Sequence, residues 1–261
     1  MQLAASTANL YPAPTEQALD DLLTLGFRTL EVFLNTESET EDGYLRDLRR
    51  RADAVGARIV SLHPYASLVE PYLLFSAYER RFRDGLRIYD RMFHAAAMLG
   101  ADFLVLHGDR EGGVLDDEAF AARYAALYDL GRTHGVTLLQ ENVVRFRACR
   151  PNMVRTMRQR LGDKARFVLD VKQCERAGVT VEEMIDAMGD AIAHVHISDC
   201  DDAHDCLPPG GGQRDFAALF RRLRDVGFDG AVTIELYRHN FGDPAELWDA
   251  GRYLTQFLAE K

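Results

Sequence analysis

The sequence predicts one (β/α)₈ barrel, a TIM barrel, as a single domain over residues 1–261. Short runs of Val, Ile, Leu and Phe alternate with longer stretches of helical character, and this alternation is typical of a parallel sheet covered by helices. Eight such strand–helix pairs in about 250 residues are the number that closes a barrel. A chain of this length can bury roughly three quarters of its unfolded surface, so one core is sufficient.

After the opening run, each predicted strand follows a glycine that ends a helical stretch. Glycine tolerates the left-handed backbone conformation at which helices commonly end. The runs that follow are almost continuously apolar, which is typical of parallel strands buried on both faces. In chain order, the predicted strands are Leu3–Ser6, Arg28–Leu34, Arg58–His63, Asp102–His107, Val136–Glu141, Arg166–Asp170, Ile192–Ser198 and Ala231–Leu236.

The stretches between these strands predict helices. Several begin with Asp, Asn or Thr near Pro or Glu, as helix N-termini do. The first begins at a threonine and places Leu19, Leu22 and Leu23 on one face. In chain order, the predicted helices are Thr15–Leu25, Tyr44–Val55, Ala77–Leu99, Asp116–Thr133, Pro151–Leu161, Val181–Met188, Asp215–Val226 and Pro244–Leu258.

A doubly wound open sheet is the alternative fold. Such a sheet usually has a glycine-rich loop after its first strand, whereas here that strand leads into Ser6-Thr7-Ala8-Asn9. Two long loops, Pro64–Ser76 and Asp199–Arg214, follow the third and seventh predicted strands. Both loops therefore lie on the face of a barrel that carries active sites.

Composition excludes several classes of protein. The chain has 31 Lys and Arg against 41 Asp and Glu, a net charge of −10, which argues against a general binder of nucleic acid or of an anionic membrane. It contains no run of 18 apolar residues and no signal-peptide pattern before Pro12. None of its four cysteines forms a Cys-x-x-Cys pair. We therefore expect a cytoplasmic protein without a nucleic-acid or membrane partner; a homo-oligomer is compatible with the sequence.

Acidic residues and histidines stand at or near the ends of the predicted strands. They are Glu31, His63, His107, Glu141, Asp170, His196 and Glu235. In a barrel these ends converge on one mouth. Carboxylates crowded together repel one another and cannot all stay ionised, and a divalent cation removes that repulsion. The convergence therefore predicts a metal site.

Each of these residues also has a structural interpretation, since a polar residue at a strand end can simply cap the next helix. Repetition at the same strand terminus favours a common site. Glu31 is followed by three apolar residues, so it is interpreted as lying within its strand and binding a helix N–H or a substrate hydroxyl. His194 points to the same side as His196 and is interpreted as a hydrogen-bonded histidine of the barrel interior.

Short motifs surround these residues along the whole chain. They are Leu62-His63-Pro64, Leu106-His107-Gly108, Gln140-Glu141-Asn142, Leu169-Asp170, His194-Val195-His196-Ile197-Ser198-Asp199, Leu207-Pro208-Pro209-Gly210 with Asp215-Phe216, and Ile234-Glu235-Leu236-Tyr237. With them the sequence resembles the xylose isomerase-like barrel superfamily, which includes sugar isomerases and epimerases and the endonuclease IV branch.

The resemblance implies that Glu141, Asp170, His196 and Glu235 are the metal ligands. It also implies that Glu141 and Glu235 are the catalytic acid and base, as in the 3-epimerases of the family. His63 and His107 match positions that line the substrate pocket in the sugar enzymes of the family. In endonuclease IV, the same positions bind a further zinc. One nitrogen and three carboxylates suit a single Mn²⁺ best; Mg²⁺, Co²⁺ and Zn²⁺ are also compatible.

The sequence departs from the family pattern in three places. Where family members commonly have Asp-x-x-His after the sixth strand, this chain has Asp170-Val171-Lys172-Gln173. Where endonuclease IV has Asp-x-His after the seventh strand, this chain has His204-Asp205-Cys206. Both changes, with the net charge, argue against a trinuclear nuclease. The arginine that many epimerases carry six residues after the metal histidine is Asp202 here, so the sugar itself is not identified.

The favoured function is that of a metal-dependent sugar isomerase or ketose 3-epimerase acting on a small carbohydrate. Glu141 and Glu235 would exchange a proton at the carbon next to the carbonyl through a metal-bound cis-enediolate. The residues expected to contact the substrate are His63, His107, Lys172, Gln173 and Arg238. The alternatives are a lyase such as a dehydratase or keto-sugar eliminase on the same site, an endonuclease IV-like phosphodiesterase, and a non-catalytic sugar-binding barrel.

Overall fold

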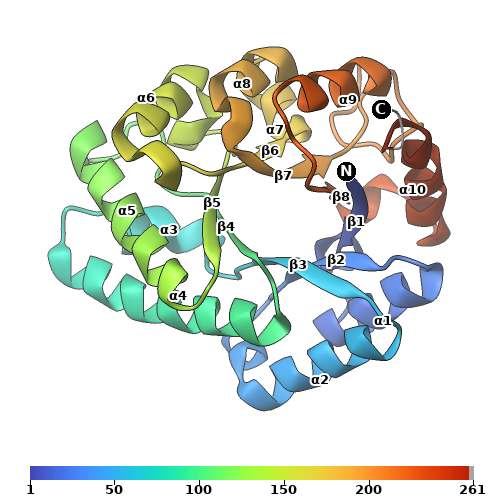
Figure 1. Cartoon of the computed structure of the whole chain (residues 1–261), viewed down its shortest axis with the longest axis horizontal. Coiled ribbons are helices and arrows are strands. Elements are labelled where there is room, and N and C mark those ends of the chain that lie inside the picture. The colour runs from blue at the N-terminus through green and yellow to red at the C-terminus, as the bar shows by residue number, and fades with distance from the viewer. Residues whose placement is uncertain (259–261) are drawn as a thin grey trace.

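A computed structural model describes residues 1–258. Its eight parallel strands form a closed barrel in chain order, and the ring closes where β8 pairs with β1. Figure 1 shows this ring of strands inside a ring of helices, with the N-terminus beside β1 and β8. The predicted TIM barrel is therefore confirmed, and the rival open sheet is wrong. Of the domain predicted over 1–261, residues 259–261 lie outside the described residues.

The strands are β1 (Gln2–Ser6), β2 (Thr29–Phe33), β3 (Arg58–His63), β4 (Phe103–Leu106), β5 (Thr137–Glu141), β6 (Phe167–Asp170), β7 (Ile192–Ile197) and β8 (Ala231–Ile234). The outer helices are α1 (Thr15–Leu25), α2 (Asp42–Ala54), α4 (Glu79–Leu99), α5 (Asp117–Thr133), α6 (Pro151–Leu161), α8 (Val181–Met188), α9 (Phe216–Asp225) and α10 (Ala245–Leu258). Each strand and each outer helix corresponds to a predicted one, with ends that differ by up to two residues.

Local chemistry ends these helices as the sequence predicts. The 21-residue helix α4 stops at Gly100, whose φ of +74° is left-handed and whose N–H bonds back to the carbonyls of Ala96 and Ala97. Helix α8 begins with a capping box, in which the Thr180 side chain accepts from the Glu183 N–H and the Glu183 carboxylate accepts from the Thr180 N–H.

The barrel interior is filled in layers. Two small apolar clusters contain Ala4, Val60, Phe103, Val105, Leu139, Val168, Ala193 and Ala231. A buried polar group of Glu31, Ser61, His194 and Thr233 lies beside them; His194 is in register with Val168, and Ser61 with Phe103. The remaining core lies between the sheet and the outer helices. Side chains at the carboxyl ends of the strands therefore stand on a packed floor.

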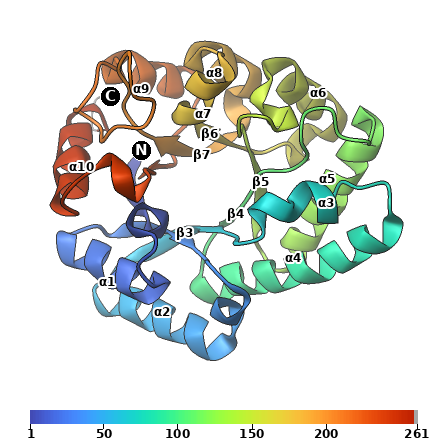
Figure 2. The same cartoon turned by 180° about the vertical axis from the view of Figure 1, so that it is seen from behind.

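Two short helices lie in loops where the sequence predicts none. Helix α3 (Glu70–Leu73) lies within the long loop after β3, in front of the strands in Figure 2. Helix α7 (Val171–Ala177) starts directly where β6 ends. Asp170 both ends that strand and caps the helix, since its Oδ1 accepts from the Gln173 N–H at 3.0 Å. No separate cap residue lies between the two elements, so the sequence does not mark where the helix starts.

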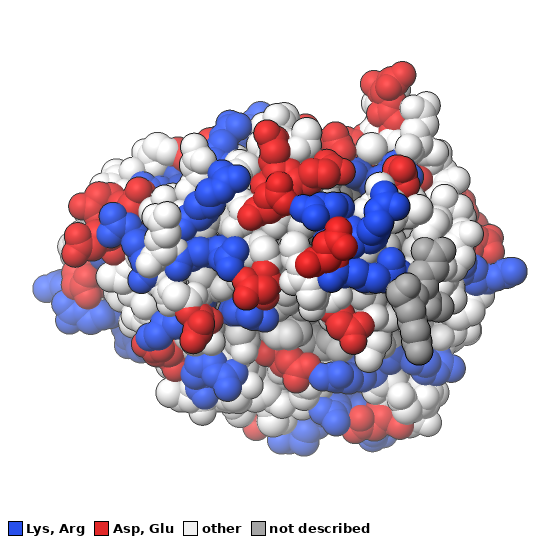
Figure 3. Space-filling view, turned by 45° about the horizontal axis from the view of Figure 1, so that its top comes forward, with Lys and Arg blue, Asp and Glu red and all other residues white. Residues whose placement is uncertain are grey.

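The surface carries charges of both signs. On the face drawn in Figure 3, Lys and Arg side chains are interspersed with Asp and Glu side chains. Among the described residues, no helix has both the length and the apolar character needed to cross a membrane.

Candidate active site

Four predicted ligands meet at the carboxyl ends of neighbouring strands. Glu141 ends β5, Asp170 ends β6, His196 lies in β7, and Glu235 follows β8 directly. One donor atom from each lies within 4.8 Å of all the others. Parallel strands deliver these side chains to one place, because alternate residues of every strand point into the barrel.

His196 Nδ1 stands at the centre of this group. It lies 3.4 Å from Glu141 Oε1, 3.3 Å from Glu235 Oε2 and 4.0 Å from Asp170 Oδ2. The carboxylates come from three different strands and face one ring nitrogen. The four side chains form one compact donor set of one nitrogen and three carboxylates.

This donor set fits a divalent cation. Glu141 Oε2 and Asp170 Oδ2 are buried, and no well-aligned hydrogen bond within the protein reaches either oxygen, although His107 Nε2 and Lys172 Nζ each lie 3.2 Å away. Buried carboxylate oxygens are costly unless cations pair with them, and a bound metal ion would add such pairing. Burial raises the pKa of Asp170 to about 7, although Lys172 acts in the opposite direction. A bound cation would favour the ionised form of each carboxylate.

Lys172 adds a positive charge to the group. Its Nζ lies 3.0 Å from Glu235 Oε2 and 3.2 Å from Asp170 Oδ2, and only 4% of its side chain is exposed. Burial acts to lower the pKa of Lys172, but Asp170 and Glu235 raise it well above its ordinary value. Burial acts to raise the pKa of Glu235, but His196 and Lys172 hold it far below its usual range. Glu235 is therefore ionised and paired.

Two histidines line the Glu141 side of the group. The Nε2 atoms of His63 and His107 lie 3.1 Å apart, and His107 Nε2 lies 3.2 Å from Glu141 Oε2. His63 stacks on the ring of Phe33, with 4.6 Å between the ring centroids. Burial acts to lower the pKa of His107, but its hydrogen bond to Glu141 raises it. Both histidines lie beside Glu141, and a molecule bound there would contact them.

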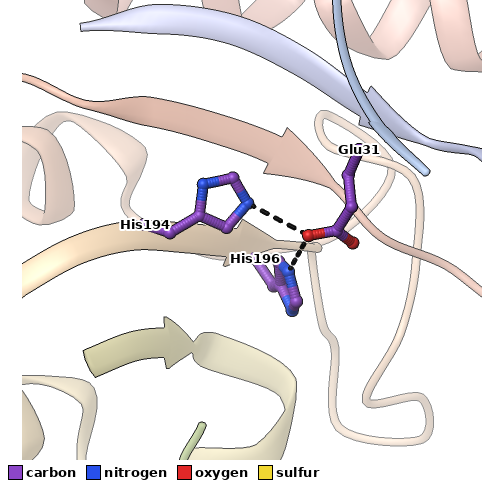
Figure 4. A group of neighbouring side chains, drawn as sticks. All are labelled: Glu31, His194 and His196. Carbon is purple, nitrogen blue, oxygen red and sulfur yellow. Dashed lines mark hydrogen bonds and ion pairs between the residues drawn. The ribbon is translucent and has the colours of Figure 1, made fainter. Parts of the chain in front are cut away.

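Glu31 lies one layer below the group, within β2 as predicted. Its Oε2 contacts His196 Nε2 at 3.1 Å and His194 Nε2 at 3.3 Å (Figure 4). Burial acts to raise the pKa of Glu31, but His196 and His194 hold it well below its ordinary value. Its described contacts are with side chains, so the helix N–H alternative is not observed, and the substrate hydroxyl stays a prediction. His194, fully buried and 3.0 Å from Thr233 Oγ1, is confirmed as a hydrogen-bonded interior histidine.

Comparison with known proteins assigns the fold to a family. The sequence model of the xylose isomerase-like TIM barrel family matches residues 19–257. The chain belongs to this family. The resemblance inferred from the strand-end motifs is therefore confirmed, as is the xylose isomerase-like form of the barrel.

Individual relatives in this family are distant. An uncharacterized protein of Mycobacterium bovis is 28% identical over 261 residues, which cover 90% of this chain and 89% of that protein. The fructoselysine 3-epimerase of Escherichia coli O157:H7 is 22% identical over 244 residues, 88% of each chain. The crystal structure of a D-tagatose 3-epimerase-like protein has a TM-score of 0.82 at 16% identity, covering 99% of this chain and 97% of that one.

Two further predicted substrate contacts are held by other partners. Gln173 lies beside Asp170 on α7, and its Oε1 accepts from the Val144 N–H at 3.1 Å. The Arg238 guanidinium donates to the carbonyls of Phe241 and Gly242 at 2.8 and 2.9 Å. Gln173 therefore ties α7 to the loop after β5, and Arg238 ties its own loop together. Neither side chain is directed at the four-residue group.

Two asparagines that the sequence analysis did not single out hold the ligand-bearing backbone. Asn142 donates to the Asp170 carbonyl at 2.9 Å and accepts from the Asp170 N–H at 2.7 Å. Asn9 does the same around Glu235, donating to the Ile234 carbonyl and accepting from the Leu236 N–H. Asn142 directly follows Glu141, and this position could have identified it from the sequence. No local sequence pattern marks Asn9.

Proposed function

We propose that this protein is a divalent-metal-dependent sugar isomerase of the ketose 3-epimerase type. One observation carries the proposal: Glu141 and Glu235 lie on different strands and both face His196 Nδ1, at 3.4 and 3.3 Å. A carbon held between two such carboxylates could lose a proton to one and regain it from the other on its opposite face. The names of the fructoselysine and D-tagatose relatives agree with this chemistry.

Glu141, Asp170, His196 and Glu235 would hold the cation. The oxygen-rich donor set suits Mn²⁺ best, and Mg²⁺, Co²⁺ and Zn²⁺ are compatible with it. When bound, the cation would act as a Lewis acid that polarises the sugar carbonyl and so acidifies the adjacent C–H. The side chain of His107 is 17% exposed. Together with His63, it would contact the hydroxyl groups of the sugar.

The two glutamates start in different surroundings. Glu235 Oε2 is paired with Lys172, which favours the ionised form that accepts a proton. Glu141 Oε2 lies 3.2 Å from His107 Nε2, from which a proton could be resupplied. We therefore assign Glu235 as the base that first removes the proton and Glu141 as the acid that returns one, with the roles exchanged in the reverse direction.

The direct test is solvent exchange. The metal-loaded protein is incubated in D₂O with a panel of ketopentoses, ketohexoses and their amine adducts, and mass spectrometry detects one incorporated deuterium together with a new epimer. Glu141→Gln and Glu235→Gln should each lower the rate by about 10² to 10⁴-fold. Glu182→Gln, at an exposed position on α8, is the matched control and should leave the rate unchanged.

Other outcomes would separate the alternatives. A product that has lost water from the substrate would replace the isomerase with a lyase on the same residues. Two or three bound zinc ions with phosphodiester cleavage would favour the nuclease branch. Sugar binding without deuterium incorporation by any panel member would contradict catalysis and leave a binding barrel.

A further inference from the structure

Below the proposed metal centre, one carboxylate oxygen is contacted by a hydroxyl group and two imidazole rings. Glu31 Oε2 lies 2.8 Å from Ser61 Oγ, 3.1 Å from His196 Nε2 and 3.3 Å from His194 Nε2. Figure 4 shows the Glu31 carboxylate directed at both rings. The Glu31 and His194 side chains are completely buried, and that of His196 is 1% exposed. No solvent reaches this layer.

A shift in strand register places Glu31 there. Leu30 pairs with Ile59, but Glu31 pairs with Ser61, so one residue of β3 is skipped at this point. Such a bulge bends a strand and redirects its side chains. Without the shift, Glu31 would stand opposite Val60. The register therefore brings Glu31 and Ser61 together beneath His196.

A carboxylate oxygen accepts hydrogen bonds, and Glu31 Oε2 already accepts one from the Ser61 hydroxyl at 2.8 Å. The His196 nitrogen that contacts the same oxygen, at 3.1 Å, is Nε2, which therefore donates its proton to it. The other ring nitrogen, Nδ1, faces Glu141 and Glu235. Once Nε2 holds the proton of the neutral ring, Nδ1 presents its lone pair to the four-residue group.

We propose that Glu31 is a positioning residue that fixes the Nε2–H tautomer and the ring orientation of His196, so that Nδ1 binds the metal ion. This inference rests on the metal centre of the proposed function, but not on the identity of the reaction. Ser61 and His194 support Glu31 from its other sides, and Thr233 Oγ1 in turn contacts His194 Nε2 at 3.0 Å. Groups behind a metal-bound histidine act in this way, and their loss typically weakens metal affinity about 10- to 100-fold.

The test compares Glu31→Gln with Ser61→Ala in the full chain. The first keeps the side-chain shape but removes the charge that demands a proton on Nε2. The second removes another hydrogen bond to the same oxygen and leaves the Glu31–His196 contact in place. Mn²⁺ is titrated into chelator-treated protein, and free Mn²⁺ is measured by electron paramagnetic resonance. We expect Kd to rise about 10- to 100-fold in Glu31→Gln and less than about threefold in Ser61→Ala.

A second measurement uses the wild-type protein, in case Glu31→Gln does not fold. In protein loaded with diamagnetic Zn²⁺ and labelled with ¹⁵N-histidine, nuclear magnetic resonance should show His196 with a protonated, slowly exchanging Nε2 and a metal-bound Nδ1. A metal-bound Nε2, or an Nε2 without a proton, would overturn the inference.

The outcomes also separate this inference from the function. Failure of the wild-type chain to bind Mn²⁺ would remove the metal centre itself. Wild-type binding that Glu31→Gln leaves unchanged would overturn only the role of Glu31. Two ions per chain, one of them lost in Glu31→Gln, would make the carboxylate a ligand rather than a positioning group and would also overturn it.

Discussion

At the scale of single residues, Lys172 distinguishes this site. It stands one residue before Gln173, which occupies the place of a histidine in many relatives that the sequence resembles. Its ammonium group contacts two proposed metal ligands, Asp170 and Glu235, at 3.2 and 3.0 Å. A fixed positive charge there competes with a cation for the same oxygens, and it also keeps Glu235 ionised. Lys172 therefore weakens the binding of a cation while it keeps the base in its ionised form.

This arrangement gives a prediction for Lys172→Met. Loss of the positive charge should raise the pKa of Glu235, because Lys172 is one of the groups that hold it low. The ionised base would then be lost at higher pH, and the acidic limb of the kcat/KM profile should move to higher pH. Metal Kd should stay equal or fall.

The matched control is Lys164→Met. In the wild type, the Lys164 ammonium group pairs with Asp129 on the surface. Its pH profile and metal Kd should equal those of the wild type. An unchanged acidic limb in Lys172→Met, with deuterium exchange intact, would show that Lys172 does not tune Glu235.

At the scale of elements, α3 joins the long loop after β3 to the end of β4. Glu70, at its first position, is fully buried; it accepts a hydrogen bond from the Tyr89 hydroxyl and another, at 2.6 Å, from the Gly108 N–H. Gly108 follows His107 directly and has a left-handed φ of +85°. The short helix therefore fixes the backbone that presents His107 to the site.

Burial raises the pKa of Glu70 despite these bonds, so its stability contribution depends on pH. A carboxyl whose pKa is raised by folding stabilises the folded state fully below its unfolded pKa, and that contribution is lost as pH rises through its folded pKa. Glu70→Gln cannot ionise. The free energy of unfolding of the variant, relative to wild type, should therefore increase as pH rises from about 4.5.

Urea denaturation at several pH values between 4.5 and 8 measures this difference. Glu182→Gln, at an exposed position on α8, should give a difference that is flat across the same range. A relative stability of Glu70→Gln that falls with rising pH would show that the carboxylate is stabilised, not penalised, by its surroundings.

The elements themselves were predictable because each strand is a nearly continuous apolar run between helices with recognisable ends. Polar residues that interrupt such runs, such as Asp170 and Glu235, were visible for the same reason. The partners of Glu31 were not, because they depend on a skipped residue in β3 that no local pattern marks. The direction of Arg238 depends on loop carbonyls three and four residues away, and strand periodicity carries no information about those.

At the scale of the molecule, the proposed metal centre joins the carboxyl ends of the last four strands, β5 to β8, over almost 100 residues of the chain. A ligand that binds only the folded state stabilises it by about 2.7 kcal/mol at 100 times Kd. For a chain of this size, we expect saturating Mn²⁺ to raise Tm by about 5–10 °C over protein treated with chelator. Differential scanning calorimetry measures the change.

Asp170→Asn is the variant that tests the origin of this stabilisation. It keeps the shape of a ligand that contacts His196 and Lys172 but removes its charge. The increase in Tm with Mn²⁺ should shrink to a small fraction of the wild-type value. An undiminished increase would locate the stabilising ion elsewhere on the protein.

Ring closure between β1 and β8 has a consequence for synthesis. Ala5 pairs with Ile234, and Asn9 holds the backbone on both sides of Glu235. A nascent chain therefore cannot complete its site until its last strand has left the ribosome, some 230 residues after the first. Until then β1 and β7 are open sheet edges, which pair readily with other chains. Premature termination before residue 231 would thus yield a fragment that lacks β8 and Glu235 and exposes two unpaired strand edges.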